Sequence, residues 1–179
     1  MSTAQIGLLT GPIGIGKTTV AVRVVELMRQ QGLTCGGLLA PAMLNSCGEK
    51  IGIMGVAVAS GEHRILARTN QKLGGPSVGP YSFDAVALAW ALETLTRDLG
   101  ACDLLIVDEV GKLELWQGTG LAPLLPRLAA GTAPRSLVLV RDSLLEELRS
   151  KLGSTQQIVF TISQENRDEM PLQILGGMT

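Results

Sequence analysis

The segment 6–19, with the sequence IGLLTGPIGIGKTT, restricts the fold more than any other part of this chain. It fits the phosphate-binding pattern G-x-x-x-x-G-K-[ST], in which Gly11, Gly16, Lys17 and Thr18 occupy the fixed positions. An apolar run precedes the glycines and a helix-like stretch comes after them, which is the strand, loop and helix order that the pattern requires. The alternative, a glycine-rich turn that binds no ligand, fits this context less well.

A loop of this kind binds phosphate because small side chains let its backbone N–H groups turn inward, next to the positive end of the following helix. We expect Lys17 to reach the β- and γ-phosphates and Thr18 to contact Mg²⁺. The expected nucleotide-binding residues of the loop are Gly11, Pro12, Ile13, Gly14, Ile15, Gly16, Lys17, Thr18 and Thr19. ATP, GTP or another nucleoside triphosphate is the expected substrate.

Length and composition favour a single domain. The chain has 179 residues, enough for one large core and too few for two, so we expect one domain over residues 1–179. Fifteen basic and 16 acidic residues leave a net charge of −1, which indicates neither a nucleic-acid surface nor a membrane surface. Hydrophobic residues make up 46% and aromatic residues 3%, which favours an aliphatic core of the kind found around buried parallel strands.

Other sequence features argue against a signal peptide, a membrane span, a disulfide framework and a zinc site. The N-terminus lacks a basic segment and no apolar run is long enough to span a membrane, so we expect no signal peptide and a cytoplasmic protein. Cys35, Cys47 and Cys102 form no C-x-x-C pair, which argues against a disulfide framework and a zinc site. His63 is interpreted as a solvated loop residue. No protein partner is indicated, and the sequence is compatible with a monomer.

The rest of the chain alternates apolar runs and helical patterns, which predicts an α/β fold with a mostly parallel central sheet and an inserted β-hairpin. We expect a helix over 17–31, a strand over 34–39, a hairpin of 51–59 and 64–68, an irregular loop over 69–80 and a helix over 83–99. A buried strand over 104–107, a short or bent helix within 118–131 and a strand over 136–140 come next. Asp142 or Ser143 is expected to cap a helix over 144–152, before a last strand at 157–162 and a polar loop at 163–168.

Asp108 and Glu109 stand at the end of the apolar run 104–107. Two acids at a strand end are common and usually belong to a solvated turn or a helix cap. Together with a phosphate-binding loop, however, Asp108 fits the acid that holds hydrated Mg²⁺, and Glu109 fits a base that polarises an attacking water. Because ligands of open α/β sheets bind at the carboxyl ends of strands, a shared site is expected if the two strands lie side by side.

Transfer of a γ-phosphoryl group spreads negative charge over its oxygens, so further positive charge is expected near Lys17. Arg141 and Arg167 are the candidates, because each comes after a predicted strand; surface arginines are the alternative for both. Arg167 and Asn166 are also candidates for contacts with the nucleotide base. In the segment DEVGKLEL, Lys112 and Glu114 are interpreted as a local ion pair that positions the loop after the acids.

The motifs GPIGIGKTT, GGLLAP, SGEHRILAR, VGPYSFD, DEVGKLEL and TISQENRD, in this order and over nearly the whole chain, resemble the THEP1 family of nucleoside-triphosphatases. The resemblance implies a RecA-like P-loop fold and slow, Mg²⁺-dependent hydrolysis of nucleoside triphosphates to diphosphates with broad base specificity. It also implies phosphate and metal binding by the loop glycines with Lys17, Thr18 and Thr19. By the same resemblance, Asp108 serves Mg²⁺ and Glu109 activates water.

The chain departs from the family pattern at three positions. Family members often carry Glu and Arg where this chain has Met43 and Leu44, and a lysine where it has Pro80. Charged contacts from those positions are therefore absent, which bears on the rate and base preference more than on the reaction.

Two other functions fit the same motifs. In a small-molecule kinase, Glu109 would accept a proton from an acceptor hydroxyl and not from water. In a nucleotide-gated binding protein with slow hydrolysis, the glycine-rich segment 74–80 would be the moving part. A Ras-like guanine switch is disfavoured, because the chain has the sequence NRDE at 166–169 and no N-K-x-D motif.

Overall fold

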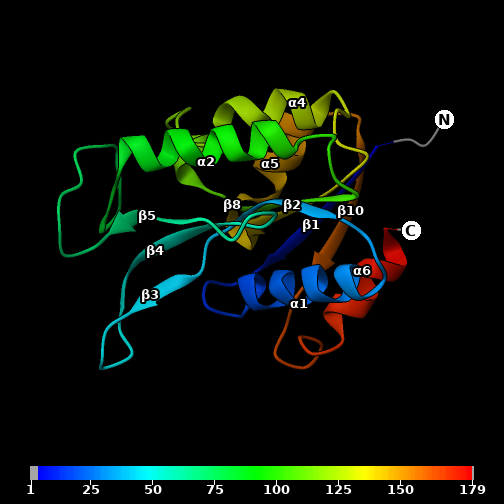
Figure 1. The fold of residues 1–179 in the computed structure, drawn as a ribbon, viewed down its shortest axis with the longest axis horizontal. Coiled ribbons are helices and arrows are strands. Elements are labelled where there is room, and N and C mark those ends of the chain that lie inside the picture. Colours follow the sequence, from blue (N-terminus) through cyan, green and yellow to red (C-terminus); the bar gives the residue numbers. More distant parts are fainter. Residues whose placement is uncertain (1–3, 179) are drawn as a thin grey trace.

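The computed structural model describes residues 4–178 and shows one sheet between two layers of helices (Figure 1). The described strands form a 10-stranded sheet in the order β10-β1-β9-β8-β2-β4-β5-β7-β6, and β3 pairs with β4 beside this path. They are β1 Gln5–Gly11, β2 Cys35–Leu39, β3 Ala42–Leu44, β4 Lys50–Ala57, β5 His63–Arg68, β6 Ser77–Val78, β7 Tyr81–Phe83, β8 Leu104–Val110, β9 Arg135–Arg141 and β10 Gln156–Thr161. The predicted α/β fold class is confirmed.

The strands β10, β1, β9, β8 and β2 pair in parallel. Their carboxyl ends therefore share one edge. The phosphate-binding loop comes after β1 at this edge, and Asp108 and Glu109 lie near the end of β8. The sequence predicted a shared site if β1 and β8 were neighbours in the sheet. The two strands are not neighbours, because β9 lies between them. This order places Arg141, the last residue of β9, between the loop and the acids.

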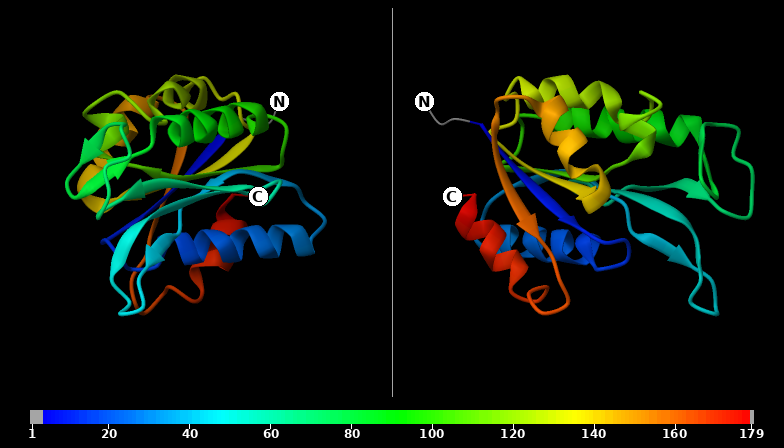
Figure 2. Two further views of the ribbon diagram at one scale, coloured as in Figure 1. Left: turned by 60° about the vertical axis from the view of Figure 1, so that its left-hand side comes forward. Right: turned by 180° about the vertical axis from the view of Figure 1, so that it is seen from behind.

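Helices cover both faces of this parallel part (Figures 1 and 2). On one face lie α1 Lys17–Gln30 and α6 Met170–Gly177, and on the other α2 Ala85–Asp98, α4 Leu125–Ala129 and α5 Leu145–Leu152. Because successive strand residues point to opposite faces, Leu8 packs in the cluster beneath α2 and Leu9 in the cluster beneath α1. Trp90, on α2, is buried in the cluster between this helix and the sheet.

The other half of the sheet is antiparallel and larger than the single hairpin predicted from the sequence. The predicted pair β4 and β5 is present, but β3 also pairs with β4, and β7 and β6 extend the sheet beyond β5. The expected loop 69–80 therefore contains β6. His63 is exposed as predicted, although it begins β5 and does not lie in a loop. In Figures 1 and 2, β3 and β4 project from the body as an arm.

Several boundaries differ from the predictions for identifiable reasons. The helix expected from residue 83 begins at Ala85, because Phe83 pairs in β7 and the Asp84 side chain accepts the N–H of Ala87 at 2.9 Å as the N-cap. The expected helix 144–152 is preceded by a 3-10 turn over Asp142–Leu144 and has no side-chain cap, so the predicted cap is wrong. The helix α6 was not predicted.

The helix within 118–131 is short and irregular, as predicted, because the segment contains Pro123 and Pro126. A 3-10 turn over Ala122–Leu124 leads directly into α4. Another short helix, α3 Lys112–Leu115, comes after the acids. No helix within residues 4–178 combines the length and apolarity that crossing a membrane requires. The expectation about a signal peptide rests partly on residues 1–3, which lie outside the described residues.

Candidate active site

The glycine-rich loop links β1 to α1 and occupies the edge where the parallel strands end. Gly16 immediately precedes α1 and has a φ of 110°, a left-handed conformation that side chains with a Cβ rarely adopt. The first N–H groups of α1 have no partner within the helix, because each would need a carbonyl one turn earlier. Loop and helix together thus present backbone donors and a positive dipole end to a phosphate group.

Lys17, the first residue of α1, folds back over the loop. Its side chain is buried, and the ammonium Nζ donates to the backbone carbonyls of Gly11 at 2.8 Å and Pro12 at 3.0 Å. Burial lowers the pKa of Lys17, opposed chiefly by the nearby carboxylate of Glu109. The two carbonyls hold the ammonium beside the positions at which the loop would bind phosphate oxygens.

Asp108 is the buried acid of the site, with 4% of its surface exposed. Its Oδ2 accepts the backbone N–H of Ala40 at 2.9 Å. Burial raises the pKa of Asp108 to about 6, although the N–H of Ala40 and the side chain of Thr18 act in the opposite direction. The hydroxyl of Thr18 and the carboxylate of Asp108 are hard oxygen donors, the kind that Mg²⁺ prefers.

Glu109 lies on the more open side of the strand end, with 32% of its side chain exposed. Arg141 contacts one of its oxygens twice: Nη2 lies 3.1 Å and Nε 3.3 Å from Oε1. Arg141 thereby holds the carboxylate in one orientation while its second oxygen, Oε2, makes no bond to the guanidinium. The strand order, with β9 beside β8, is what brings this pair together.

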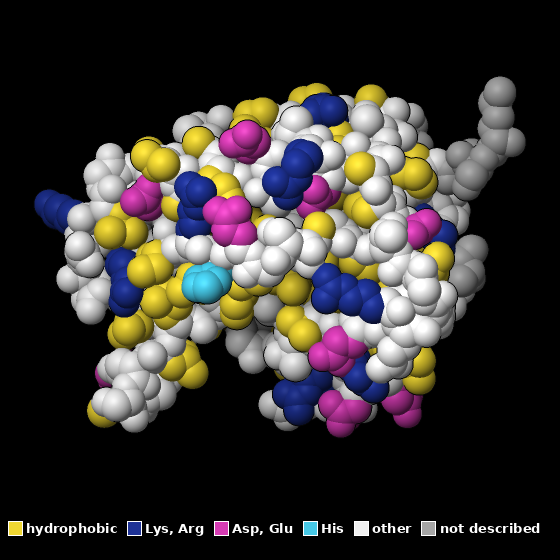
Figure 3. All heavy atoms as spheres, viewed as in Figure 1, with side chains coloured by type: hydrophobic (Ala, Val, Ile, Leu, Met, Phe, Trp, Pro, Cys, Tyr) yellow, Lys and Arg dark blue, Asp and Glu magenta, His cyan; other side chains and the backbone are white. Residues whose placement is uncertain are grey.

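A cavity of about 310 Å³ runs along these residues. Of the predicted site residues, it is lined by Ile13, Gly14, Gly16, Lys17, Thr18, Thr19, Asp108, Glu109 and Arg141. Gly11 and Pro12 contribute through the carbonyls that hold Lys17. In the space-filling view, the molecule is hollowed between the projecting arm and the α1 layer (Figure 3).

The arm contributes residues that sequence analysis missed. Lys50, the first residue of β4, lines the same cavity together with Pro41 and Ala42. The ammonium Nζ of Lys50 lies 5.1 Å from the centroid of the Tyr81 ring, a cation–π contact that orients it. No motif in the sequence marks Lys50, because its position depends on the pairing of β3 with β4. Met43 and Leu44, two of the departures from the family pattern, lie in the same arm.

Arg167 and Asn166 lie outside this cavity. The amide of Asn166 is engaged within its own loop: its Oδ1 accepts the N–H of Ser163 at 2.8 Å and its Nδ2 donates to the carbonyl of Thr161 at 3.0 Å. The exposed Arg167 lies over Gly16, where a Cβ would stand 3.1 Å from its Cδ. Its Nε lies 3.7 Å from the Asp168 carboxylate.

The predicted ion pair between Lys112 and Glu114 is wrong. Glu114 is buried and accepts two backbone N–H groups, from Gly111 at 2.9 Å and Leu121 at 3.2 Å. Burial raises the pKa of Glu114 to about 7. Lys112 instead lies over the ring of Trp116, at 4.6 Å from its centroid. Glu114 thus positions the chain after the acids, as expected of this segment, but through backbone groups.

Comparisons with known proteins identify the family of this chain. A family model described as NTPase matches residues 7–175. The nucleoside-triphosphatase THEP1 of Methanopyrus kandleri is 33% identical over 171 residues, which cover 94% of this chain and 92% of that protein.

Two solved structures are similar over nearly their whole lengths. The crystal structure of THEP1 from the hyperthermophile Aquifex aeolicus matches with a TM-score of 0.73 and 20% identity, covering 97% of this chain and 98% of that one. The solution structure of a human cancer-related nucleoside triphosphatase matches with a TM-score of 0.69 and 26% identity, covering 98% of both chains.

Proposed function

The chain belongs to the NTPase family, the nucleoside-triphosphatases that include THEP1, and on this premise we propose that it hydrolyses nucleoside triphosphates to diphosphate and phosphate. The proposed reaction is Mg²⁺-dependent, accepts different bases, and uses Glu109 to activate water. The observation that carries the proposal is that Lys17, Thr18, Asp108, Glu109 and Arg141 line one cavity.

The loop would bind the triphosphate through backbone N–H groups at the start of α1. Lys17 already sits above the loop on two carbonyl oxygens, so its ammonium is oriented before a nucleotide arrives. Its positive charge would face the β- and γ-phosphates, where negative charge increases during transfer. Arg141 would add a second positive charge from the strand β9.

Thr18 and Asp108 would hold Mg²⁺ together with phosphate oxygens, since Mg²⁺ sites of this type use one or two protein oxygens. Supporting this assignment, Thr18 and Asp108 line the same cavity, and the backbone N–H of Ala40 holds the Asp108 carboxylate. When bound, the ion neutralises charge on the β- and γ-phosphate oxygens.

Glu109 would accept a proton from the attacking water. The water oxygen forms a bond to the γ-phosphorus, the bond from that phosphorus to the β–γ bridging oxygen breaks, and the nucleoside diphosphate leaves. Arg141 supports this role because it fixes the Glu109 carboxylate through Oε1. The second carboxylate oxygen then has a defined direction for a water.

The hydrogen bonds of the Asn166 side chain support broad base specificity. This side chain was the amide expected to read a base, and both of its ends bond locally, within residues 161–166. Arg167 lies near the phosphate loop, and its guanidinium is proposed to stack on a base, an interaction that every base accepts. We also propose a cytoplasmic location, because nucleoside triphosphates and Mg²⁺ are abundant there.

A second candidate, transfer to a small organic acceptor, is favoured by one observation: an apolar cavity adjoins Glu109 on the side away from the phosphate loop. Phosphate release without any acceptor separates the two, because a kinase leaks only slowly to water.

The test is phosphate release by the purified protein from ATP, GTP, CTP and UTP, with and without Mg²⁺. We expect release from all four, loss of activity when Mg²⁺ is removed, and rates for the four bases within about tenfold of one another. Lys17→Ala, purified in the same way, is the control for contaminating phosphatases and should lose nucleotide binding and hydrolysis together. Equal phosphate release by Lys17→Ala and the parent protein would contradict the proposal.

A further inference from the structure

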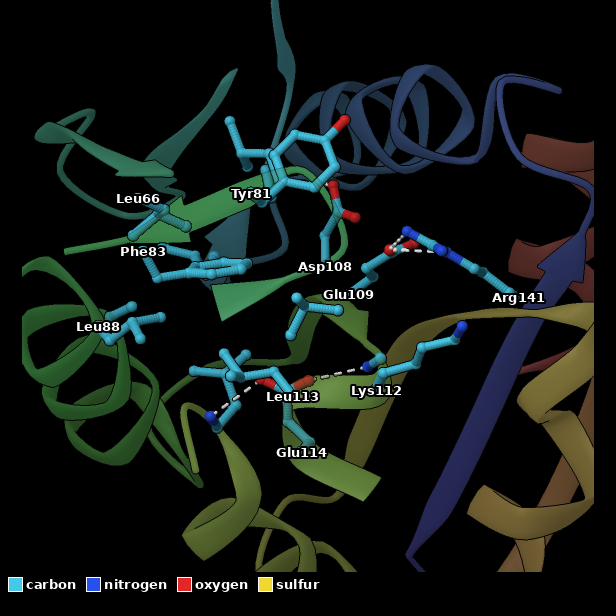
Figure 4. Close-up of a pocket in the computed structure, with 17 residues that line it drawn as sticks. Leu66, Tyr81, Phe83, Leu88, Asp108, Glu109, Lys112, Leu113, Glu114 and Arg141 are labelled. Carbon is cyan, nitrogen blue, oxygen red and sulfur yellow. Dashed lines mark hydrogen bonds and ion pairs between the residues drawn. The ribbon is translucent and has the colours of Figure 1, made fainter. Parts of the chain in front are cut away.

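A second cavity, the apolar cavity, lies beyond the acids of β8 and between the sheet and α2 (Figure 4). Its volume is about 90 Å³, which is room for little more than one six-membered ring. Its apolar walls come from several elements and include Leu38, Leu66, Phe83, Leu88, Ala91 and Leu113.

The apolar cavity adjoins the cavity of about 310 Å³ described above, which we call the nucleotide cavity, at Asp108 and Glu109. Ala40, Ile53, Asp108, Glu109 and Arg141 line both. In the close-up, Leu66, Phe83 and Leu88 lie at one end of the apolar cavity, while Glu109 and Arg141 lie at the other (Figure 4). A molecule inside it would therefore have one end among apolar side chains and the other end beside Glu109.

The polar groups of the apolar cavity favour one orientation for such a molecule. Both oxygens of Glu114 already accept backbone N–H groups, so this carboxylate has no strong need of a ligand. At the opposite end, Glu109 uses only Oε1 for Arg141. A hydroxyl donor placed next to Glu109 would find an acceptor there, whereas the leucine and phenylalanine walls offer none.

We propose that the apolar cavity binds a small primary alcohol with an apolar body about one ring in size, and that this alcohol is a phosphoryl acceptor. The proposal rests on the proposed nucleotide site and Glu109. The alcohol oxygen forms a bond to the γ-phosphorus, the bond to the β–γ bridging oxygen breaks, and the nucleoside diphosphate leaves with the electron pair. Glu109 takes the hydroxyl proton. Hydrolysis is the same step with water in place of the alcohol.

The first measurement tests occupancy. Benzyl alcohol, 3-pyridylmethanol and cyclohexylmethanol are titrated into the Mg²⁺-ADP complex of the protein carrying ¹³C-labelled leucine methyl groups. We expect Leu66, Leu88 and Leu113 to shift, while the exposed Leu172 on α6 does not. Absence of any shift at the three cavity leucines with all three alcohols would overturn the proposal, whether or not the protein hydrolyses nucleotides.

The second measurement tests transfer. With Mg²⁺-ATP and each alcohol, ³¹P NMR should detect the alkyl phosphate beside inorganic phosphate. Ala91→Leu fills the cavity from α2 and should lower the ratio of alkyl phosphate to phosphate at least about tenfold. Phosphate release without alcohol should stay within about twofold, because Ala91 does not line the nucleotide cavity.

Val86→Leu is the matched control, since Val86 lies on the same helix with 71% of its surface exposed. Its product ratio should equal that of the parent protein. If Ala91→Leu does not fold, Leu88→Phe makes the same test. Binding of the alcohols without any alkyl phosphate, in protein that hydrolyses ATP, would overturn the acceptor role. Absence of ATP hydrolysis with intact leucine shifts would instead count against the proposed hydrolytic function.

Discussion

The parallel and antiparallel halves of the sheet contribute to the candidate site in different ways. In the parallel half, Arg141 and the two acids come from the carboxyl ends of β9 and β8, and Lys17 begins the helix after the loop that follows β1. The three strands are consecutive in the sheet. Their placement is explained by the carboxyl-end rule for parallel strands. The antiparallel half contributes Lys50 and Tyr81 from an arm and an edge hairpin, where no such rule applies. The groups proposed to act on the phosphates thus come from the parallel half, and the antiparallel half adds Lys50 and part of the cavity walls.

We expect the largest losses of activity from substitutions in the parallel half. Asp108→Asn keeps an oxygen that accepts the Ala40 N–H but removes the negative charge. We expect phosphate release to fall by about 10³-fold and the Mg²⁺ concentration needed for half-maximal rate to rise. Titrations of rate against Mg²⁺ measure both. A normal rate with a normal Mg²⁺ requirement would remove Asp108 from the metal site.

Arg141→Ala should have a smaller effect than Asp108→Asn. It removes both the contacts that orient Glu109 and a positive charge of the cavity, so we expect turnover to fall about 10- to 100-fold. Arg141→Lys keeps the charge without the guanidinium fork and should recover only part of the loss. Steady-state phosphate release from all three proteins makes the comparison. Full activity of Arg141→Ala would mean that this residue is a structural surface arginine.

In the antiparallel half, Lys50→Met should act mainly on nucleotide binding. Lys50 lines the cavity but is exposed and lies on the arm, so we expect KM for the nucleotide to rise about three- to tenfold with a smaller change in kcat. Lys72→Met, an exposed lysine outside the cavity lining, is the control. A loss in kcat as large as that of Arg141→Ala would erase the difference between the two halves.

Glu114→Gln should have the smallest effect on turnover and a measurable effect on stability. The pKa of Glu114 is about 7 in the folded protein, compared with 4.5 as its ordinary value. The folded protein therefore binds the proton of Glu114 more tightly than the unfolded chain does. The stabilisation that results is fully present below pH 4.5 and is lost as the pH rises to about 7. The loss is of the order of 3 kcal/mol.

Urea unfolding at pH 5 and pH 8 measures this contribution. Glu114→Gln should be less stable than the parent at pH 5, because an amide has one acceptor oxygen and its NH2 group would face the second backbone N–H, a donor. Between the two pH values, however, it should lose less stability than the parent protein. Asp108 titrates in both proteins and cancels in the difference. Parallel losses in the two proteins would contradict the assignment of this titration to Glu114.

The sequence predicted the parallel half well because each of its features is local. The glycine loop, the apolar run before Asp108 and the run before Arg141 each specify a strand together with the residues at its carboxyl end. The insertion of β9 between β1 and β8 could not be predicted, because strand order depends on packing between distant segments. The ion contact between Arg141 and Glu109 is a consequence of that order.

The antiparallel half was less predictable, because its strands also depend on pairing between segments that the sequence does not mark. The run at β4 and β5 has a recognisable turn, whereas β6 and β7 are short and have glycine and proline neighbours that are typical of a loop. The role of Lys50 in the cavity depends on the pairing of β3 with β4. Asn166 shows the opposite error, since its polarity suggested base contacts and its amide instead closes a local turn.

The role of Glu109 in activating water is tested most directly by comparing Glu109→Gln with the parent protein. Nucleotide affinity and single-turnover hydrolysis of Mg²⁺-ATP are measured for both. Glutamine has nearly the same shape and keeps an oxygen toward Arg141, but it cannot take a proton. We expect a dissociation constant within about threefold of the parent value and a hydrolysis rate lower by about 10²- to 10³-fold. An unchanged hydrolysis rate at unchanged affinity would contradict the assignment of Glu109 as the group that activates water.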